Sequence, residues 1–427
     1  MRIHKLTLHN FRNFSERSFE FPSLFTVVIG ENGKGKSSLL QGMRLAAGTF
    51  LLGLDEAERL HIQKEDVRRI ATERQFAPQP NCFFRAEGEV SDKPFIWQRT
   101  LSRLGGRTDT KDASDIIEEA GRLNSEVNVS LNENTDLPVI CFFSTARLWV
   151  ESKQTINLKK KGSIIKDGYV RCLDMRHDRA SALAWVKSNY YKNLKDGRDG
   201  GLLEAVLNAI STCVPDWTPE EWDEDYDDLA GTYVTEEGVE SYVPLYYLSD
   251  GLRTMAHMAA EIAYRCAILN GHHGKEAVIN SKGIVLIDEI DMHLHPNWQR
   301  TVIHDLKKAF PHIQFVVTTH SPFIVQSAKA EELINLDTFT DANPPQLSLE
   351  EVATEIMQVE DIHSVSYEET YKQAEAYFKT LNEGSKKFMT PEESTQYNKK
   401  LDEIEKNIED PAYAAFLKLN RLAKQKK

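Results

Sequence analysis

The sequence predicts an α/β fold built around a parallel sheet, and three observations lead to this prediction. The apolar run SLFTVVIG (23–30) ends on a glycine and predicts a strand. A glycine-rich stretch follows it, and the next segment, SSLLQGMRLAAGTFL, has helical spacing. Two further apolar runs, KGIVLIDEI and IQFVVTTH, are separated by about thirty residues. The segment between them, NWQRTVIHDLKKAF, has helical spacing. Strand, helix and strand at this separation form a βαβ unit with parallel strands.

The other elements follow from the same patterns. IHKLTLHNF alternates like a half-exposed strand, FFRAEGEV and KPFIWQRTL are typical of paired strands, and LPVICFFST (137–145) predicts a buried strand. Residues 55–75 are charged and predict a helix. Further helices are expected at SALAWVKSNYYKNL, GLLEAVLNAISTCV and LRTMAHMAAEIAYRCAIL, and a hairpin at YVTEEGVESYVPLYYL, after the acidic run 219–228. From about Ala330 the chain is polar and helical.

Composition restricts the possible functions. The 427 residues carry a formal net charge of −13, so any contact with DNA must come from a local basic patch. One candidate patch is the run that contains Lys159, Lys160, Lys161, Lys166 and Arg171. The five cysteines are scattered and form no CxxC pair, which favours reduced thiols in a cytoplasmic protein. No apolar run reaches eighteen residues, so we expect no membrane segment.

The segment GENGKGKSS (30–38) matches the pattern GxxxxGK[ST] through Gly30, Gly35, Lys36 and Ser37. Glycines let the backbone form a nest whose N–H groups point at phosphate oxygens. The lysine then reaches the β- and γ-phosphates, and the serine hydroxyl binds Mg²⁺. A strand before the loop and a helix after it complete the context for a nucleotide phosphate loop.

Two acids end the buried strand GIVLIDEIDMHLHP (283–296). Asp288 is expected to hold Mg²⁺ through water, and Glu289 to act as the general base for an attacking water. His320 ends the next strand, where it can contact the γ-phosphate. Such acids also occur as helix caps, and a single histidine is often only packed. The phosphate loop in the same chain favours the functional interpretation.

These motifs, taken in order, resemble those of the ABC-type ATPases of the chromosome-maintenance and DNA-break-repair branch. GENGKGKSS, LSDGL, VLIDE, HLHP and TTHSP look like the Walker A, signature, Walker B, D-loop and switch-histidine motifs, and NFRNF (10–14) is similar to the first strand of that branch. The resemblance implies a P-loop ABC-type ATPase head with a mixed sheet, a compact inserted lobe and a helical C-terminal tail. The expected parts are residues 1–60 and 246–345 for the head, 61–245 for an inserted α+β lobe that includes the buried strand 137–143 of the head, and 346–427 for a tail that binds a partner.

By this resemblance each motif receives a role. The nucleotide-binding residues are Arg12, Asn32, Gly33, Lys34, Gly35, Lys36, Ser37 and Ser38. Glu289 and His320 are catalytic, and Ser37 and Asp288 bind the metal. Ser249, Asp250 and Gly251 form a signature that completes the site of a second subunit.

The chain departs from the family pattern in two places. Its signature reads LSDGL instead of LSGGQ, so Asp250 would repel a γ-phosphate unless it points away or pairs with a cation such as Arg253. The Q-loop glutamine is not assigned. Ser144 stands where it is expected, and Gln63 and Gln75 are the alternatives.

LPVICFFSTARLW, YLSDGLRTM, GIVLIDEIDMHLHPNWQR and IQFVVTTHSP also resemble the PtuA group, the ATPases of the Septu anti-phage defence system. This resemblance implies an ATPase that requires ATP and Mg²⁺ and forms a homodimer or a higher homo-oligomer. It also implies an HNH-type nuclease subunit (PtuB-like) as partner, with DNA as a further candidate and no membrane. The chain itself carries no nuclease signature. The alternatives are a stand-alone DNA-repair or recombination ATPase of the recombination-mediator type, a transporter subunit, and an ATP-binding protein without turnover.

Overall fold

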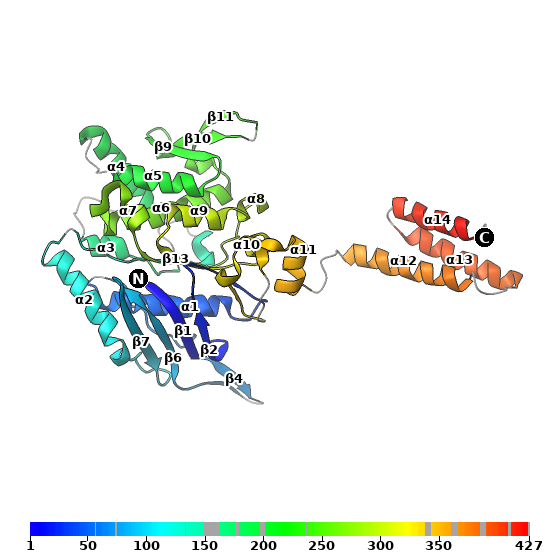
Figure 1. The fold of residues 1–427 in the computed structure, drawn as a ribbon, viewed down its shortest axis with the longest axis horizontal. Coiled ribbons are helices and arrows are strands. Elements are labelled where there is room, and N and C mark those ends of the chain that lie inside the picture. Colours follow the sequence, from blue (N-terminus) through cyan, green and yellow to red (C-terminus); the bar gives the residue numbers. More distant parts are fainter. Residues whose placement is uncertain are drawn as a thin grey trace. The chain divides into compact units, whose positions relative to one another are not determined.

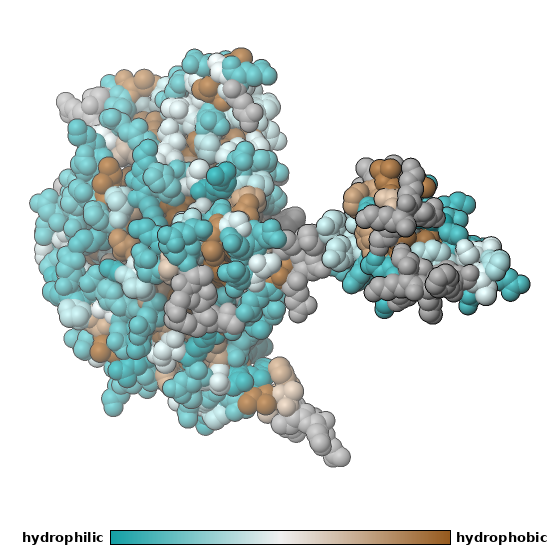
Figure 2. Space-filling model, turned by 45° about the vertical axis from the view of Figure 1, so that its right-hand side comes forward, coloured by the Kyte–Doolittle hydropathy of each residue, from teal (hydrophilic) through white to brown (hydrophobic). Residues whose placement is uncertain are grey.

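The computed structural model describes the chain except for residues 56, 73–74, 133, 149–162, 176–178, 197–200, 236, 338–342, 360–364, 385–389, 409–410 and 426–427. The chain forms two compact units, Met1–Val352 and Ala353–Lys427, and Figure 1 shows the elements of each. In the described parts, no helix has the length and apolar character needed to cross a membrane. The face of the first unit seen in Figure 2 is mainly hydrophilic.

A five-stranded parallel sheet forms the centre of the first unit. Its strand order is β14-β3-β13-β12-β8, and every neighbouring pair is parallel. The strands are β3 (Phe25–Ile29), β8 (Val139–Phe143), β12 (Gly283–Ile287), β13 (Ile313–Thr318) and β14 (Leu333–Asn335). All residues of β3, β8, β12 and β13 are buried, because helices cover both faces of this sheet. The predicted βαβ unit is confirmed, with α9 (Val302–Ala309) between β12 and β13.

A second, antiparallel sheet lies below the first in Figure 1, with the order β2-β1-β6-β7. Its strands are β1 (Arg2–Phe11), β2 (Phe14–Glu20), β6 (Cys82–Val90) and β7 (Lys93–Leu101). The helix α1 (Lys36–Gly48) contacts strands of both sheets and is therefore buried on almost every side. A Cβ at Gly42 would lie 2.7 Å from a methyl group of Leu8, so this helix packs directly on β1.

One buried side chain joins the two sheets. Gln314 in β13 donates from Nε2 to the carbonyl of Ile3 at 2.7 Å, and its Oε1 accepts from the Ile3 N–H at 2.8 Å. The amide thus makes the two hydrogen bonds that a neighbouring strand would make with Ile3. Without them, the N–H and carbonyl of this buried residue would lack these partners.

Helices cover the other face of the parallel sheet (Figure 1). α5 contacts both α6 and α9, and α6 also contacts β8. The helices of the first unit not yet given are α2 (Ser114–Asn128), α3 (Ile164–Tyr169), α4 (Arg179–Asp196), α5 (Leu202–Cys213), α6 (Asp250–Leu269), α7 (Ala277–Asn280), α8 (Pro296–Gln299), α10 (Pro322–Ser327) and α11 (Leu349–Glu351). A small antiparallel sheet of β9 (Trp217–Asp223), β10 (Asp228–Val234) and β11 (Glu240–Pro244) includes the predicted hairpin.

The prediction of a helix at residues 55–75 is wrong. In its described part the chain runs through coil and a turn into β4 (Arg69–Thr72), which pairs with β5 (Gln75–Pro78). The Arg68 N–H donates to the carbonyl of Asn10 at 2.8 Å, and the carbonyl of Asp66 accepts from the Arg12 N–H at 2.7 Å. Tertiary hydrogen bonds therefore take backbone groups that a helix would have used, and they override the local propensity.

The α-helices in the described part of the second unit are α12 (Val365–Gly384), α13 (Pro391–Asn407) and α14 (Pro411–Gln425). Their buried core consists of Tyr377, Leu381, Leu401, Ile408 and Leu417. The Tyr377 hydroxyl donates to Glu405 at 2.6 Å inside this core, which satisfies a buried polar group.

Candidate functional site

The carboxyl ends of the five parallel strands lie at one edge of the sheet, where the phosphate loop and most of the candidate residues are found. β3 leads into the phosphate loop at Gly30, β12 into Asp288, and β8 into Ser144. Thr318 ends β13, and Asp337 follows β14. Open α/β sheets bind ligands at this edge, because loops from several strands come together there.

The phosphate loop has the backbone that its glycines predict. Gly33 and Gly35 have φ of 85° and 109°, in the left-handed region that favours glycine. Lys36 donates from Nζ to the carbonyls of Gly30 at 2.6 Å and Glu31 at 3.1 Å. Burial lowers the pKa of Lys36, and the nearby carboxylates of Asp337 and Asp288 oppose that shift. The Lys36 side chain thus hydrogen-bonds to the start of the loop, where its positive charge can bind an anion.

The segment NFRNF supports this loop from the antiparallel sheet. A Cβ at Gly35 would lie 2.7 Å from the ring of Phe14, so the loop rests directly on that ring. Asn13 donates from Nδ2 to the carbonyl of Gly33. Arg12 binds Asp66 through Nε at 2.9 Å and Nη2 at 2.8 Å. Arg12 is therefore next to residues that touch the loop, and its side chain is held by a carboxylate that is 1% exposed.

Asp337 anchors the loop from the opposite side. Its Oδ2 accepts from the Glu31 N–H at 2.7 Å, and its Oδ1 lies 3.1 Å from Nζ of Lys34. Asn32, Gly33 and Lys34 are exposed, whereas Ser38 is buried at the start of α1. The predicted loop residues are thus split between an exposed rim and a buried base.

The predicted metal ligands lie together. The Ser37 hydroxyl is 3.2 Å from Oδ2 of Asp288, although the two residues are 251 positions apart in the sequence. Thr318 donates from its hydroxyl to Oδ1 of Asp288 at 2.6 Å. Two hard oxygen donors beside a phosphate loop are the ligands that Mg²⁺ prefers. The residues present therefore fit a Mg²⁺ ion bound with a nucleotide phosphate.

Glu289 follows at once with φ of 50°, which is uncommon for a residue other than glycine. Its N–H donates to the Thr318 hydroxyl at 2.8 Å, so Thr318 contacts both acids. His320 is exposed at the same edge. Its two neighbours are fixed, because Thr319 donates to Asp291 at 2.6 Å and Ser321 donates to Gln299 at 2.6 Å.

The signature segment begins α6. Ser249 is exposed and caps the helix by accepting from the Leu252 N–H. A Cβ at Gly251 would lie 2.4 Å from the carbonyl of His293, so this glycine lets the helix start pack against the loop after Asp288. Asp250 is 2.5 Å from Nη2 of Arg253. The cation expected to neutralise Asp250 is therefore in place.

Several supporting residues were missed by the sequence analysis, namely Asn13, Phe14, Asp66, Thr318 and Asp337. Asn13 and Phe14 lie in NFRNF and Thr318 lies in TTHSP, so these three had a local signal, whereas Asp66 and Asp337 had none. Ser144 at the end of β8 donates to the carbonyl of Met175 at 2.6 Å. The alternative Q-loop residue Gln63 donates to the carbonyl of His61 at 3.2 Å.

The candidate basic patch is described only in part. Lys159, Lys160 and Lys161 lie outside the described residues, while Lys166 is exposed at the surface of α3.

Together, the parallel sheet, the phosphate loop, the Asp288–Glu289 pair and the capped α6 define a P-loop protein of the ABC-type ATPase head class. Residues 25–326 match the family described as "AAA domain, putative AbiEii toxin, Type IV TA system", and the chain belongs to this family.

Two curated proteins illustrate the relationship. The Septu protein PtuA of Bacillus mycoides is 26% identical over 328 residues, which cover 75% of this chain and 38% of PtuA. The Retron Vc95 probable ATPase of Vibrio cholerae is 43% identical over 93 residues, 22% of this chain and 18% of that protein. The chain thus spans less than two fifths of the length of either relative.

Among solved structures, the SMC head domain from Thermotoga maritima is 15% identical, with a TM-score of 0.41 over 81% of this chain and 97% of its own. The strand order and the site geometry, rather than this distant likeness, define the class.

Proposed function

We propose that the chain binds and hydrolyses ATP, dimerises around it, and controls a separate nuclease in anti-phage defence. The observation that carries this proposal is the assembly of Ser37, Asp288 and Thr318 beside the phosphate loop. Ser37 and Asp288 hold Mg²⁺, which neutralises charge on the phosphates of bound ATP. Glu289 orients the attacking water as general base, and His320 contacts the γ-phosphate. The buried free thiols fit a cytoplasmic protein.

The start of α6 supports the dimer. Ser249 is exposed at the N-terminus of a 20-residue helix, where backbone N–H groups and the helix dipole favour an anion. In the proposed dimer this end faces the γ-phosphate held by the phosphate loop of the other subunit. ATP then binds the dimer more tightly than the monomer and shifts the population towards the closed state. Hydrolysis removes that phosphate and reopens the dimer.

Glu289→Gln tests the hydrolytic step. The variant keeps the side-chain shape and removes the base, so phosphate release should fall by about a hundredfold or more while ATP binding persists. Light scattering should then detect a dimer that accumulates with ATP and Mg²⁺. Glu331→Gln, at an exposed site away from the loop, is the matched control. Turnover of Glu289→Gln at the rate of the native chain would contradict the assignment of the base.

The helical second unit is the proposed dock for the nuclease, which we take to be an HNH-type subunit by the likeness to PtuA. Phe416, Leu419 and Leu422 are each more than half exposed and recur every three residues along α14. This spacing places them on one face of the helix, as a partner-binding surface requires.

Co-purification with an HNH-type nuclease encoded beside this chain tests the dock. Leu419→Glu combined with Leu422→Glu should abolish co-purification, because two charges would be buried at the interface. Leu194→Glu, on the exposed face of α4 in the first unit, should leave it intact. Retention of the nuclease by the double variant would show that it binds elsewhere, while the proposed ATPase activity would be unaffected by that result.

A further inference from the structure

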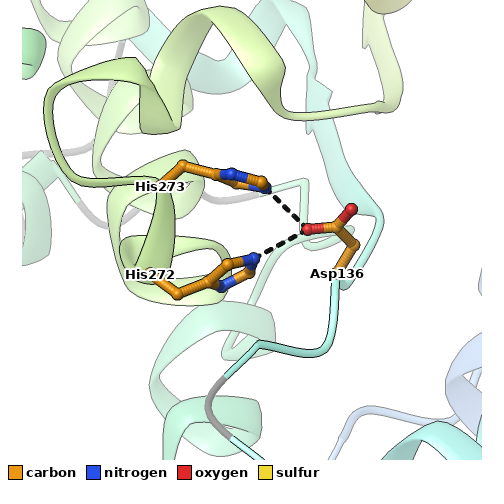
Figure 3. A group of neighbouring side chains, drawn as sticks. All are labelled: Asp136, His272 and His273. Atoms are coloured by element: carbon orange, nitrogen blue, oxygen red, sulfur yellow. Dashed lines mark hydrogen bonds and ion pairs between the residues drawn. The ribbon is translucent and has the colours of Figure 1, made fainter.

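Three side chains converge at the amino ends of the parallel strands, the opposite edge from the phosphate loop. Nε2 of His272 and Nε2 of His273 lie 2.9 and 2.7 Å from the same oxygen, Oδ1 of Asp136 (Figure 3). The two imidazole rings are 4.1 Å apart between centroids. Each of the three residues has one possible metal-ligand atom, an imidazole nitrogen or a carboxylate oxygen, within 4.8 Å of those of the other two.

The backbone on both sides of this group is fixed. His272 and His273 lie in the 3₁₀ turn Gly271–Glu276, directly after the end of α6. Gly274 follows the two histidines with φ of 56°, in the left-handed region that favours glycine, and the chain changes direction there. On the other side, Asp136 precedes Leu137, whose N–H donates to Oδ1 of Asn270 at 2.8 Å and whose carbonyl accepts from Nδ2 of Asn270 at 3.0 Å.

Asn270 caps α6, so these two hydrogen bonds tie the end of α6 to the segment that enters β8. These hydrogen bonds hold the backbone that carries the carboxylate close to the backbone that carries the two imidazoles. The three side chains themselves are partly exposed to solvent. The side chains of His272, His273 and Asp136 are 13%, 27% and 68% exposed.

We propose that Asp136, His272 and His273 form a binding site for a divalent transition-metal ion of the Zn²⁺ class. Imidazole nitrogens with one carboxylate oxygen are typical ligands for Zn²⁺, and they are less suited to Mg²⁺ or Ca²⁺. Three protein ligands leave a fourth position for water at the surface.

Only a small movement of Asp136 is needed to bring its carboxylate to a ligand position. Ligand bonds of the usual length in a tetrahedral site place neighbouring ligand atoms about 3.3 Å apart. The Nε2–Oδ1 distances are 2.9 and 2.7 Å, so Asp136 must move outwards by a few tenths of an ångström. Its high exposure leaves room for this movement. The ion then braces the end of α6 against the start of β8.

The proposed metal ion would link α6 to the segment that enters β8. Both elements also lead to the candidate ATP site, although the ion itself lies at the opposite edge of the sheet. Ser249 of the signature caps the start of α6, and β8 pairs with β12, which is followed by Asp288. Metal binding therefore stabilises the junction between the signature helix and the sheet. This inference does not depend on ATP hydrolysis.

Co²⁺ titration of the untagged full chain, without nucleotide and in excess Mg²⁺, tests the site. A tetrahedral site gives Co²⁺ a strong visible absorption, whereas octahedral sites made of oxygen ligands give a weak one. We expect one strongly absorbing Co²⁺ per chain, displaced by Zn²⁺. His273→Ala and Asp136→Asn should each weaken binding by at least about tenfold, since even an outer-shell change typically costs that much. His304→Ala, at an exposed histidine of α9, is the matched control.

Thermal unfolding supplies a second measurement. Zn²⁺ should raise the Tm of the native chain and of His304→Ala, but not of His273→Ala or Asp136→Asn, because an ion that binds only the folded state stabilises it. If the native chain shows no strong absorption and no rise in Tm, the three side chains only hydrogen-bond to one another and the proposal is wrong. Equal binding by the native chain and both variants would place the ion elsewhere and would also overturn it.

Discussion

Thr318 donates a hydrogen bond from its hydroxyl to Asp288 at 2.6 Å, and the same oxygen accepts from the N–H of Glu289. One side chain at the end of β13 therefore fixes both acids at the end of β12. Asp288 in turn faces Ser37 on the phosphate loop, so three separate segments of the chain meet at the proposed metal ligands. The proposed chemistry depends on this positioning as much as on the acids themselves.

Replacing Thr318 by valine should reduce ATP turnover by about tenfold, because a hydrogen bond to a charged group typically contributes 1.5–3 kcal/mol. Valine keeps the shape and suits a buried strand, so the fold should persist. The measurement is steady-state phosphate release as a function of Mg²⁺ concentration, with an increased requirement for Mg²⁺ expected. Thr212→Val, on α5, is the control. An unchanged kcat and Mg²⁺ dependence would show that Thr318 does not position the acids.

Arg12 makes its contacts with a buried carboxylate, and this suggests a structural role. Arg12→Ala should lower the free energy of unfolding by about 3 kcal/mol, because it leaves the buried carboxylate of Asp66 without its cationic partner. Urea denaturation measures the change, and Arg12→Met combined with Asp66→Leu should lose less. A variant with native stability but a raised KM for ATP would instead indicate that Arg12 contacts the nucleotide.

The pair of Asp250 and Arg253 lies at the signature. An exposed pair of this kind contributes only about 0.5 kcal/mol to stability, so its effect should appear in function. Arg253→Ala frees the charge of Asp250 and should raise the ATP concentration required for dimerisation, through repulsion of the γ-phosphate. Adding Asp250→Asn should reverse this effect. If the double variant is as impaired as Arg253→Ala, charge at Asp250 is not the cause.

Much of the fold could be predicted from local patterns. The apolar runs of β3, β12 and β13 and the helical spacing of α1, α6 and α9 carry their own signals, since buried parallel strands are continuously apolar. The segment 55–75 was predicted wrongly because its charged residues favour a helix, while its backbone bonds to distant strands instead. Gln314 gave no sign that its amide would join two sheets.

The candidate site divides in the same way. Lys36, Ser37, Asp288 and Glu289 stand in motifs whose spacing reflects phosphate chemistry. Asp66 and Asp337 act through contacts with residues far away in the sequence, which only the folded chain brings together. Asp136 likewise lies 136 and 137 positions from its two histidine neighbours, so no local spacing could indicate the group.

The most direct test of the central claim is complementation between two inactive variants. Lys36→Ala removes the phosphate contact, and Ser249→Arg blocks the signature while leaving ATP binding by the monomer intact. Each should lack ATPase activity alone. In a mixed dimer, the intact loop of one chain faces the intact signature of the other.

Equal mixing should therefore restore up to about a quarter of the native phosphate release, because half of randomly formed dimers are mixed and each holds one intact site. The assay is phosphate release from the separate variants and from their mixture at the same total concentration. Recovery of activity only in the mixture is the predicted result. A mixture as inactive as its components, or a Ser249→Arg variant with native turnover, would contradict a site shared between two subunits.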